Sequence, residues 1–178
     1  LIELGVAIGA VSGARVMAQP RDSRTERGAG RASLARLPNA PDPAIAFLKD
    51  FKSIVLVGAV PPMAFFAFPG KPSLLAPESC EIINLAGVAD DSAAALTALA
   101  DELGARPNSS MHQQLAKPDL PTGNVTPDKL GQAIAALLPA NSIVVDEAVT
   151  TGRPFWGATK GAEPHDYISL TGGSIGWG

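Results

Sequence analysis

The sequence predicts an α/β protein with a Rossmann-like parallel sheet and flanking helices. Short runs of branched apolar residues alternate with segments of helical periodicity, and this alternation is typical of βαβ units. Three of the runs, residues 14–19, 53–59 and 80–86, are apolar enough to be buried on both faces, as central parallel strands are. We therefore expect residues 1–104 to pack as one parallel layer of strands and helices.

The helices of this first domain are predicted from apolar spacing and from residues typical of helix ends. Residues 1–13 and 42–51 have helical patterns, and residues 91–104 place their apolar side chains on one face before Gly104, a typical C-terminal stop. That face consists of Leu96, Leu99, Ala100 and Leu103. Because residue 1 is Leu and the chain stops within a glycine-rich run, we expect both ends to be cut and the first strand to be missing.

Residues 105–124 are predicted to be a linker between two domains. They are polar and rich in Pro, Asn, Ser and Gln, a composition typical of connecting segments. His112 lies within this stretch. Since no second His, Cys or carboxylate cluster stands near it at ligand spacing, we interpret it as a solvated residue rather than a metal ligand.

Residues 125–178 are predicted to be the start of a second α/β domain. Thr126 and Pro127 have the residue types of an N-cap and a first helical position, and apolar residues then recur at helical spacing. Apolar runs at residues 142–148 and 166–171 predict two strands after this helix. We do not expect two strands and a helix to close a core by themselves.

Charge and composition limit the classes of function. The formal net charge is −3, and Lys and Arg are scattered outside residues 15–36, which argues against a nucleic-acid surface. No apolar run approaches the ~18 residues needed to cross a bilayer. The single Cys80 excludes an internal disulfide and a cysteine zinc cage, and we interpret it as a buried, inert thiol. We expect a cytoplasmic protein.

Two clusters have both a binding interpretation and a structural one. Arginines within residues 18–39 could contact an anionic ligand such as a CoA or nucleotide phosphate, but a solvated basic loop is the simpler interpretation. These arginines are Arg21, Arg24, Arg27 and Arg31. Phe65, Phe66 and Phe68 follow a predicted strand, where aromatic residues usually fill a core or a domain interface.

Two stretches of the sequence resemble known enzymes. Residues 144–178, VVDEAVTTGRPFWGATKGAEPHDYISLTGGSIGWG, resemble the opening of the diphosphate-binding domain in thiamin-diphosphate enzymes of the acetolactate synthase and benzoylformate decarboxylase group. Residues 55–75, VLVGAVPPMAFFAFPGKPSLL, resemble the central domain of acetolactate synthase-like proteins. The resemblance implies part of a lyase or carboligase that acts on a 2-oxo acid, uses thiamin diphosphate with Mg²⁺, and assembles as a homodimer or homotetramer.

The resemblance also implies which residues would contact the cofactor. The carbonyl of Gly173 would accept a hydrogen bond from the exocyclic amine, and Ile175 would hold the cofactor in a bent conformation. Glycine lets backbone approach a ring closely, and a β-branched side chain is stiff. Thr150 and Thr151, at the carboxyl end of a predicted strand, could donate to the diphosphate or simply cap the turn. The glycine-rich cradle is completed by Gly172 and Ser174.

Members of this group also carry features that do not occur in these 178 residues. These features are a catalytic glutamate in an amino-terminal domain and a Gly-Asp-Gly to Asn motif that holds Mg²⁺ or Ca²⁺ through oxygen ligands. Asp146 and Glu147 do not replace them, because adjacent residues of a strand point to opposite faces. We therefore expect the 178 residues alone to be inactive and to bind no cofactor.

Two alternatives stay open at this point. FAD, which true acetolactate synthases hold in the central domain, is a less favoured cofactor here, because residues 18–39 contain no clean flavin-binding pattern. A different class of function is a non-catalytic Rossmann-like module that binds a nucleotide or docks onto a partner.

Overall fold

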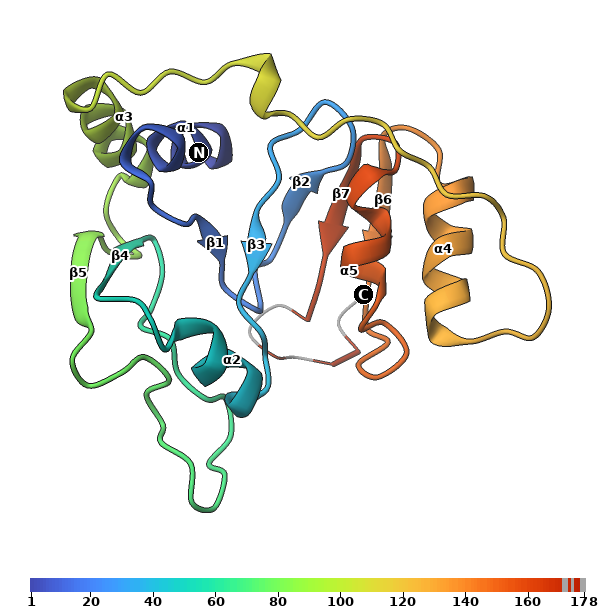
Figure 1. The fold of residues 1–178 in the computed structure, drawn as a ribbon, viewed down its shortest axis with the longest axis horizontal. Helices are drawn as coiled ribbons and strands as arrows, with labels where there is room; N and C mark the ends of the chain where they lie inside the picture. Colours follow the sequence, from blue (N-terminus) through green and yellow to red (C-terminus); the bar gives the residue numbers. More distant parts are fainter. Residues whose placement is uncertain (171–172, 174, 177–178) are drawn as a thin grey trace. The chain divides into compact units, whose positions relative to one another are not determined.

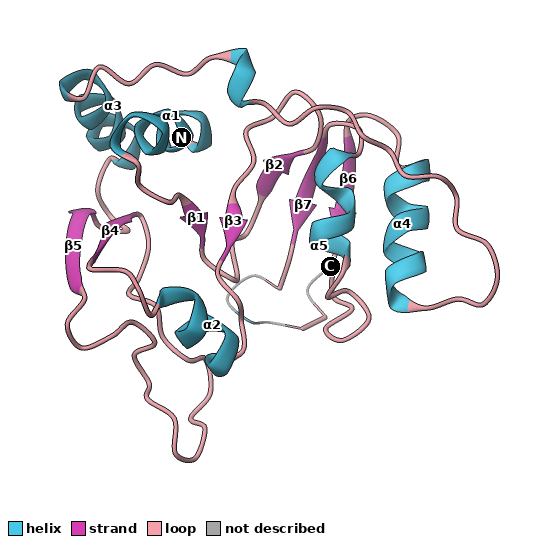
Figure 2. Ribbon diagram, viewed as in Figure 1, coloured by secondary structure: helices cyan, strands magenta, loops and turns pink. Residues whose placement is uncertain are grey.

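The computed structural model describes residues 1–170, 173 and 175–176. By their internal contacts the residues form two compact units, each built from two stretches of chain: Leu1–Pro20 with Leu34–Arg106, and Arg21–Ser33 with Pro107–Gly178. Parallel strands flanked by helices occur in both units, as Figures 1 and 2 show. The predicted α/β class is confirmed.

Three helices and four strands form the first unit. Their bounds are α1 Ile2–Ser12, β1 Met17–Ala18, β3 Ala35–Arg36, α2 Pro41–Leu48, β4 Ser53–Val57, β5 Glu81–Ala86 and α3 Ser92–Glu102. Strand β1 pairs in parallel with β3, and β4 pairs in parallel with β5. Helices α1 and α3 pack side by side (Figure 1).

The helix ends of this unit follow the local signals in the sequence. Helix α1 ends at Gly13, whose φ of 74° lies in the left-handed region that favours glycine. At the start of α3 the Asp91 carboxylate accepts hydrogen bonds from the backbone N–H groups of Ala93 and Ala94, at 3.0 and 2.9 Å. Gly104 follows the last turn with φ 66°, as its position predicts.

The single buried layer predicted for residues 1–104 is wrong in two respects. The hydrogen bonds of β1 go to β3, so the predicted strands form two separate pairs rather than one sheet. Strand β5 is not buried on both faces, because Ile82, Ile83 and Leu85 are 37–40% exposed. The physical reason is that the side chains of β5 point to the two faces of the β4–β5 pair, and the elements packed on these faces leave them partly exposed.

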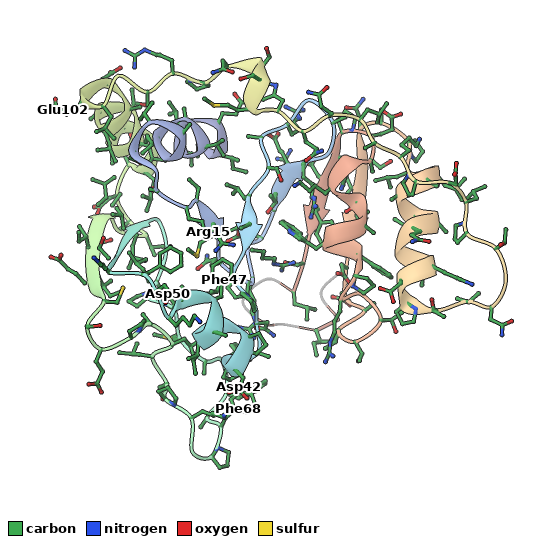
Figure 3. The ribbon with its side chains drawn as sticks, viewed as in Figure 1. Arg15, Asp42, Phe47, Asp50, Phe68 and Glu102 are labelled. Carbon is green, nitrogen blue, oxygen red and sulfur yellow. The ribbon has the colours of Figure 1, made fainter. Side chains whose placement is uncertain are left out.

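The core of this unit forms around helix α2. Four buried residues make its centre, and partly buried apolar side chains pack against them: Leu37, Ala44, Leu48 and Leu75, surrounded by Met17, Ile45, Phe47, Phe51, Ile54 and Ala64. The Arg15 guanidinium lies 4.2 Å from the centre of the Phe47 ring (Figure 3), a cation–π contact at the edge of this core. Cys80 is buried and is not in a disulfide, as predicted.

Phe65, Phe66 and Phe68 do not fill this core. All three side chains are exposed, and the rings of Phe65 and Phe66 meet edge to face with centroids 4.7 Å apart. They lie in the long connection between β4 and β5, where Met63 and Leu74 form a short antiparallel bridge. The prediction that these aromatic residues fill a core is therefore wrong, because the loop that carries them leaves all three side chains exposed to solvent, while a role at a domain interface stays a prediction.

The second unit contains a three-stranded mixed sheet in the order β2-β7-β6. Its elements are β2 Thr25–Arg27, the 3₁₀ turn η1 Ser109–Met111, α4 Pro127–Leu137, β6 Ser142–Val145, α5 Phe155–Ala158, the 3₁₀ turn η2 Thr159–Gly161 and β7 His165–Ile168. Strand β7 runs parallel to β6 and antiparallel to β2. The two strands predicted after residue 125 are thus completed by a third strand from much earlier in the sequence (Figure 1).

Residues Arg21–Ser33 lie outside the parallel layer predicted for residues 1–104, since they belong to the second unit. The polar stretch 105–124 supports them through backbone hydrogen bonds. Gly30 N–H donates to the carbonyl of Gln113 at 2.9 Å, and Gln113 N–H donates to the carbonyl of Arg31 at 2.8 Å. The backbone of this stretch is therefore hydrogen-bonded to the protein at Gln113, whereas its composition predicts a solvated linker.

Helix α4 begins as its sequence predicts. The hydroxyl of Thr126 accepts a hydrogen bond from the Lys129 N–H at 3.3 Å, and Pro127 occupies the first turn. Within the described part of the chain, no helix is both long and apolar enough to pass through a membrane.

The adjacent residues Leu74 and Leu75 test the position of the first core. Leu75 is 3% exposed, so Leu75→Ala should lower the free energy of unfolding by about 2–5 kcal/mol, the usual cost of a core cavity. Leu74 is 58% exposed, so Leu74→Ala should change it by less than about 0.5 kcal/mol. Urea denaturation of both variants measures the difference, and equal losses would contradict the assignment of Leu75 to the core.

Candidate functional site

Four of the residues predicted to bind a cofactor, Thr150, Thr151, Gly173 and Ile175, are described by the structure, and they lie in the segments that follow β6 and β7. Val145 and Ile168 are paired in register at the ends of β6 and β7. The loop 146–152 follows β6, and the described residues 169–170, 173 and 175–176 follow β7. Because β6 and β7 are parallel, both loops leave the sheet at its carboxyl edge, where α/β proteins bind ligands. Thr150 and Thr151 are in the first loop.

The second loop carries Gly173 and Ile175, while the predicted residues Gly172 and Ser174 lie outside the residues that the structure describes. The two loops are joined directly, because Glu147 Oε1 accepts a hydrogen bond from the backbone N–H of Gly176 at 3.0 Å. This bond connects residues 29 positions apart in the sequence. It brings the first loop, residues 146–152, next to the second one. We call them the threonine loop and the glycine loop.

The first loop is held compact by the side chain of Asp146. Asp146 Oδ1 accepts a hydrogen bond from the backbone N–H of Ala148 at 3.0 Å, and Gly152 N–H donates to the carbonyl of Ala148 at 2.5 Å. Gly152 is buried against the carboxylate, and a Cβ at this position would collide with it. Thr150 and Thr151, in the same turn, are exposed to solvent.

The second loop offers open backbone and an exposed apolar side chain. Gly173 and Gly176 both have φ of 80°, a conformation that favours glycine, and space around Gly176 is open where a Cβ would be. Ile175 is 72% exposed. The two loops thus present exposed threonine side chains on one side and glycine backbone with one exposed apolar side chain on the other.

The two adjacent carboxylates of the first loop have different partners. Asp146 Oδ2 accepts a hydrogen bond from the Tyr167 hydroxyl at 2.5 Å, whereas Glu147 bonds to the glycine loop. Their side chains therefore do not form a paired acid–base site. The reason predicted from strand alternation is wrong, because β6 ends at Val145 and both residues lie in the loop that follows it. Asp146 stabilises its own loop, and Glu147 connects it to the next one.

Arg27 is a structural residue of this site that the sequence did not indicate. Its side chain is buried, with the guanidinium 3.7 Å from the Trp156 ring centre and 5.4 Å from that of Tyr167. Arg27 Nη2 donates a hydrogen bond to the Trp156 carbonyl at 2.5 Å. The prediction of a solvated basic loop is wrong for Arg27, because strand β2 turns this residue inward, onto the aromatic rings.

The neighbouring arginine fits the solvated interpretation better. Arg24 is exposed and its guanidinium lies 3.0 Å from Asp166 Oδ2. The hydrogen bond to Asp166 and the negative charge of Asp166 raise the pKa of Arg24 above its ordinary value. No signal in the short polar sequence Arg-Thr-Glu-Arg, residues 24–27, distinguishes Arg27 from Arg24. The pairing of β2 with β7 decides which of the two is buried.

His165 is a second buried polar residue, directly opposite Arg27 in the β2–β7 pair. It is 4% exposed, its Nδ1 lies 2.7 Å from the carbonyl oxygen of Glu163, and its Nε2 is buried without a hydrogen-bond partner among the described residues. Burial lowers the pKa of His165 below its ordinary 6.5, and the positive charge of Arg27 acts in the same direction. The Glu163 carbonyl and Asp166 oppose this shift.

The described part of the chain contains no group of three or more His, Cys, Asp or Glu side chains arranged to hold a metal ion. His112, interpreted above as a solvated linker residue, is partly buried, and its backbone pairs with Ala32 in an isolated antiparallel bridge.

Comparison with known proteins agrees with the resemblance found in the two stretches of sequence. The chain is 42% identical over 170 residues to a Mycobacterium tuberculosis protein named "Putative acetolactate synthase large subunit IlvX". The aligned region covers 94% of this chain and 32% of that protein, so the chain spans about a third of the length of the relative it matches. No family model matches the sequence.

The stability of the second unit should depend on pH through His165. The unfolded chain binds a proton at this histidine near pH 6.5, while the folded chain binds it at lower pH, so the unfolded state binds more protons in between. Stability should therefore fall as the pH decreases from about 7.5 to about 5.5. Urea denaturation at the two pH values measures the loss. His165→Asn should reduce this pH dependence, and an unchanged dependence would count against the assignment.

Proposed function

We propose that this chain is a segment of a thiamin-diphosphate-dependent enzyme of the acetolactate synthase type, a lyase or carboligase that acts on a 2-oxo acid. The observation that carries the proposal is the hydrogen bond between Gly176 and Glu147, because it joins the threonine loop to the glycine loop at the carboxyl edge of two parallel strands. The similarity to the mycobacterial protein supports the choice of enzyme class.

The described residues fit this cofactor chemically. Thr150 and Thr151 are exposed and have hydroxyl donors for a diphosphate, and Gly173 has a left-handed backbone and no Cβ to stand between its carbonyl and a ring. Ile175 adds an exposed, stiff apolar surface. When bound, thiamin diphosphate supplies a nucleophilic carbon for attack on the keto group and accepts the electron pair released with carbon dioxide.

In this proposal the residues of the chain bind and orient the cofactor. The hydroxyl groups of Thr150 and Thr151 donate hydrogen bonds to the diphosphate, and the carbonyl of Gly173 accepts one from the exocyclic amine. Ile175 supports the bent form of the cofactor. Gly172 and Ser174 are proposed to complete the cradle.

The same proposal includes features that go beyond the cofactor loops. Mg²⁺ would accompany the diphosphate and would take its oxygen ligands from sequence other than these 178 residues. We also propose a homodimer or homotetramer and a cytoplasmic location. The proposal does not include FAD.

Ile175→Ala, in the protein that contains this chain, tests the role of the glycine loop. The turnover number should fall by up to about a hundredfold, because small errors in the position of reacting groups are costly. Since Ile175 is 72% exposed, the free energy of unfolding should change by less than about 0.5 kcal/mol. Steady-state kinetics and urea denaturation of the same variant measure the two quantities.

Leu137→Ala is the matched control for this variant. Leu137 is also an exposed branched residue of the second unit, but it lies on α4 rather than in either loop. Its turnover and stability should equal those of the wild type. A large loss of stability in Ile175→Ala, with turnover per folded molecule unchanged, would make Ile175 an ordinary packing residue and would remove the support for a cofactor site.

We expect these 178 residues on their own to have no decarboxylase or acetolactate-forming activity, because the resemblance assigns the catalytic glutamate and the Mg²⁺ ligands to other sequence. Calorimetric titration with thiamin diphosphate and Mg²⁺ should show no saturable heat at micromolar concentrations. Binding with a micromolar Kd would need a binding free energy of about 8 kcal/mol. Turnover of pyruvate that survives removal of contaminating host enzymes would contradict this expectation, as would saturable micromolar binding.

A further inference from the structure

The threonine loop needs an anchor in order to act as a binding site. Thr150 and Thr151 are exposed, so the loop is not held by burial of the residues that would contact a ligand. A mobile loop would lose conformational entropy when it bound a diphosphate, and this loss would weaken affinity. The anchor on the sheet side of the loop is the carboxylate of Asp146.

Asp146 connects the loop to the buried side chain of Tyr167. One carboxylate oxygen accepts the Ala148 N–H inside the loop, and the other accepts the Tyr167 hydroxyl at 2.5 Å. Gly152 packs against the same carboxylate, so both ends of the loop meet at one group. A hydrogen bond to a charged acceptor is stronger than one between neutral groups.

The Tyr167 ring is held in place by its contacts with Trp156 and Arg27. Tyr167 is 1% exposed, and its ring meets the Trp156 ring edge to face, with centroids 5.2 Å apart. The Arg27 guanidinium lies against Trp156 and near Tyr167, and it is held by the Trp156 carbonyl. The hydroxyl of Tyr167 therefore has a fixed position on the sheet side of the loop.

We propose that Tyr167 is a positioning residue whose hydroxyl, acting through Asp146, fixes the loop that presents Thr150 and Thr151 to the diphosphate. The inference rests on the proposed function, because it concerns the same cofactor loop. Tyr167 is buried and its hydroxyl is already bonded to Asp146, so its contribution is the geometry of the loop and not a contact with substrate.

Tyr167→Phe tests this inference, because it removes the hydroxyl and keeps the ring against Trp156. The first readout needs no cofactor: hydrogen exchange of the Ala148 and Gly152 amides in the 178-residue chain should become about tenfold faster. Exchange in β7 serves as an internal reference for global unfolding. The second readout is the thiamin diphosphate concentration for half-saturation of the protein that contains this chain, which should rise about tenfold.

Thr159→Val is the matched control. Thr159 is buried, and its hydroxyl donates to the Phe155 carbonyl at 2.9 Å, so the variant also loses one buried hydroxyl bond in the same unit. Neither Thr159 nor Phe155 belongs to the threonine loop. The amide exchange in the loop and the half-saturation concentration should therefore stay at wild-type values in Thr159→Val.

The two readouts separate failure of this inference from failure of the proposed function. Wild-type exchange at Ala148 and Gly152 in Tyr167→Phe overturns the inference whatever the cofactor does. Faster exchange with unchanged half-saturation also overturns it, because the loop geometry would then not serve binding. If the wild-type protein does not bind thiamin diphosphate, the proposed function fails, and the exchange readout alone decides whether Tyr167 holds the loop.

Discussion

The second unit is organised around the buried guanidinium of Arg27. A charged group is costly to bury unless its hydrogen bonds and its charge are compensated. Here the carbonyl of Trp156 accepts one N–H, and the electron-rich faces of Trp156 and Tyr167 lie near the positive charge. This arrangement requires strand β2 to lie along β7, so a segment that is polar in sequence becomes part of the sheet.

The pairing with β2 has consequences for the candidate site. Strand β7 is paired on both edges, with β2 on one side and β6 on the other, and this pairing keeps Tyr167 in the middle of the sheet. The ring of Tyr167 packs against α5 through Trp156, while its hydroxyl reaches Asp146 at the start of the threonine loop. Tyr167 thus contacts both Arg27, on the inward face of β2, and Asp146, at the carboxyl edge of the sheet.

The chemical groups of the candidate site divide into those that build it and those that face a ligand. The two carboxylates build it, because Asp146 closes its own loop and Glu147 ties that loop to the glycine loop. The threonine hydroxyl groups, the glycine backbone and Ile175 are the exposed groups. Each carboxylate thus accepts hydrogen bonds from the protein itself, and the groups left exposed on the two loops carry no negative charge.

The α/β class, the positions of the main helices and the ends of several of them follow from the sequence alone. These features depend on neighbouring residues, such as Thr126 capping α4 and Gly104 following α3, so short-range physics is enough to predict them. The tertiary structure decided the pairing of β2 with β7, the burial of Arg27 and the exposure of β5. The physical reason is that burial and strand pairing depend on partners far away in the sequence, and no local pattern records which partner a strand will find.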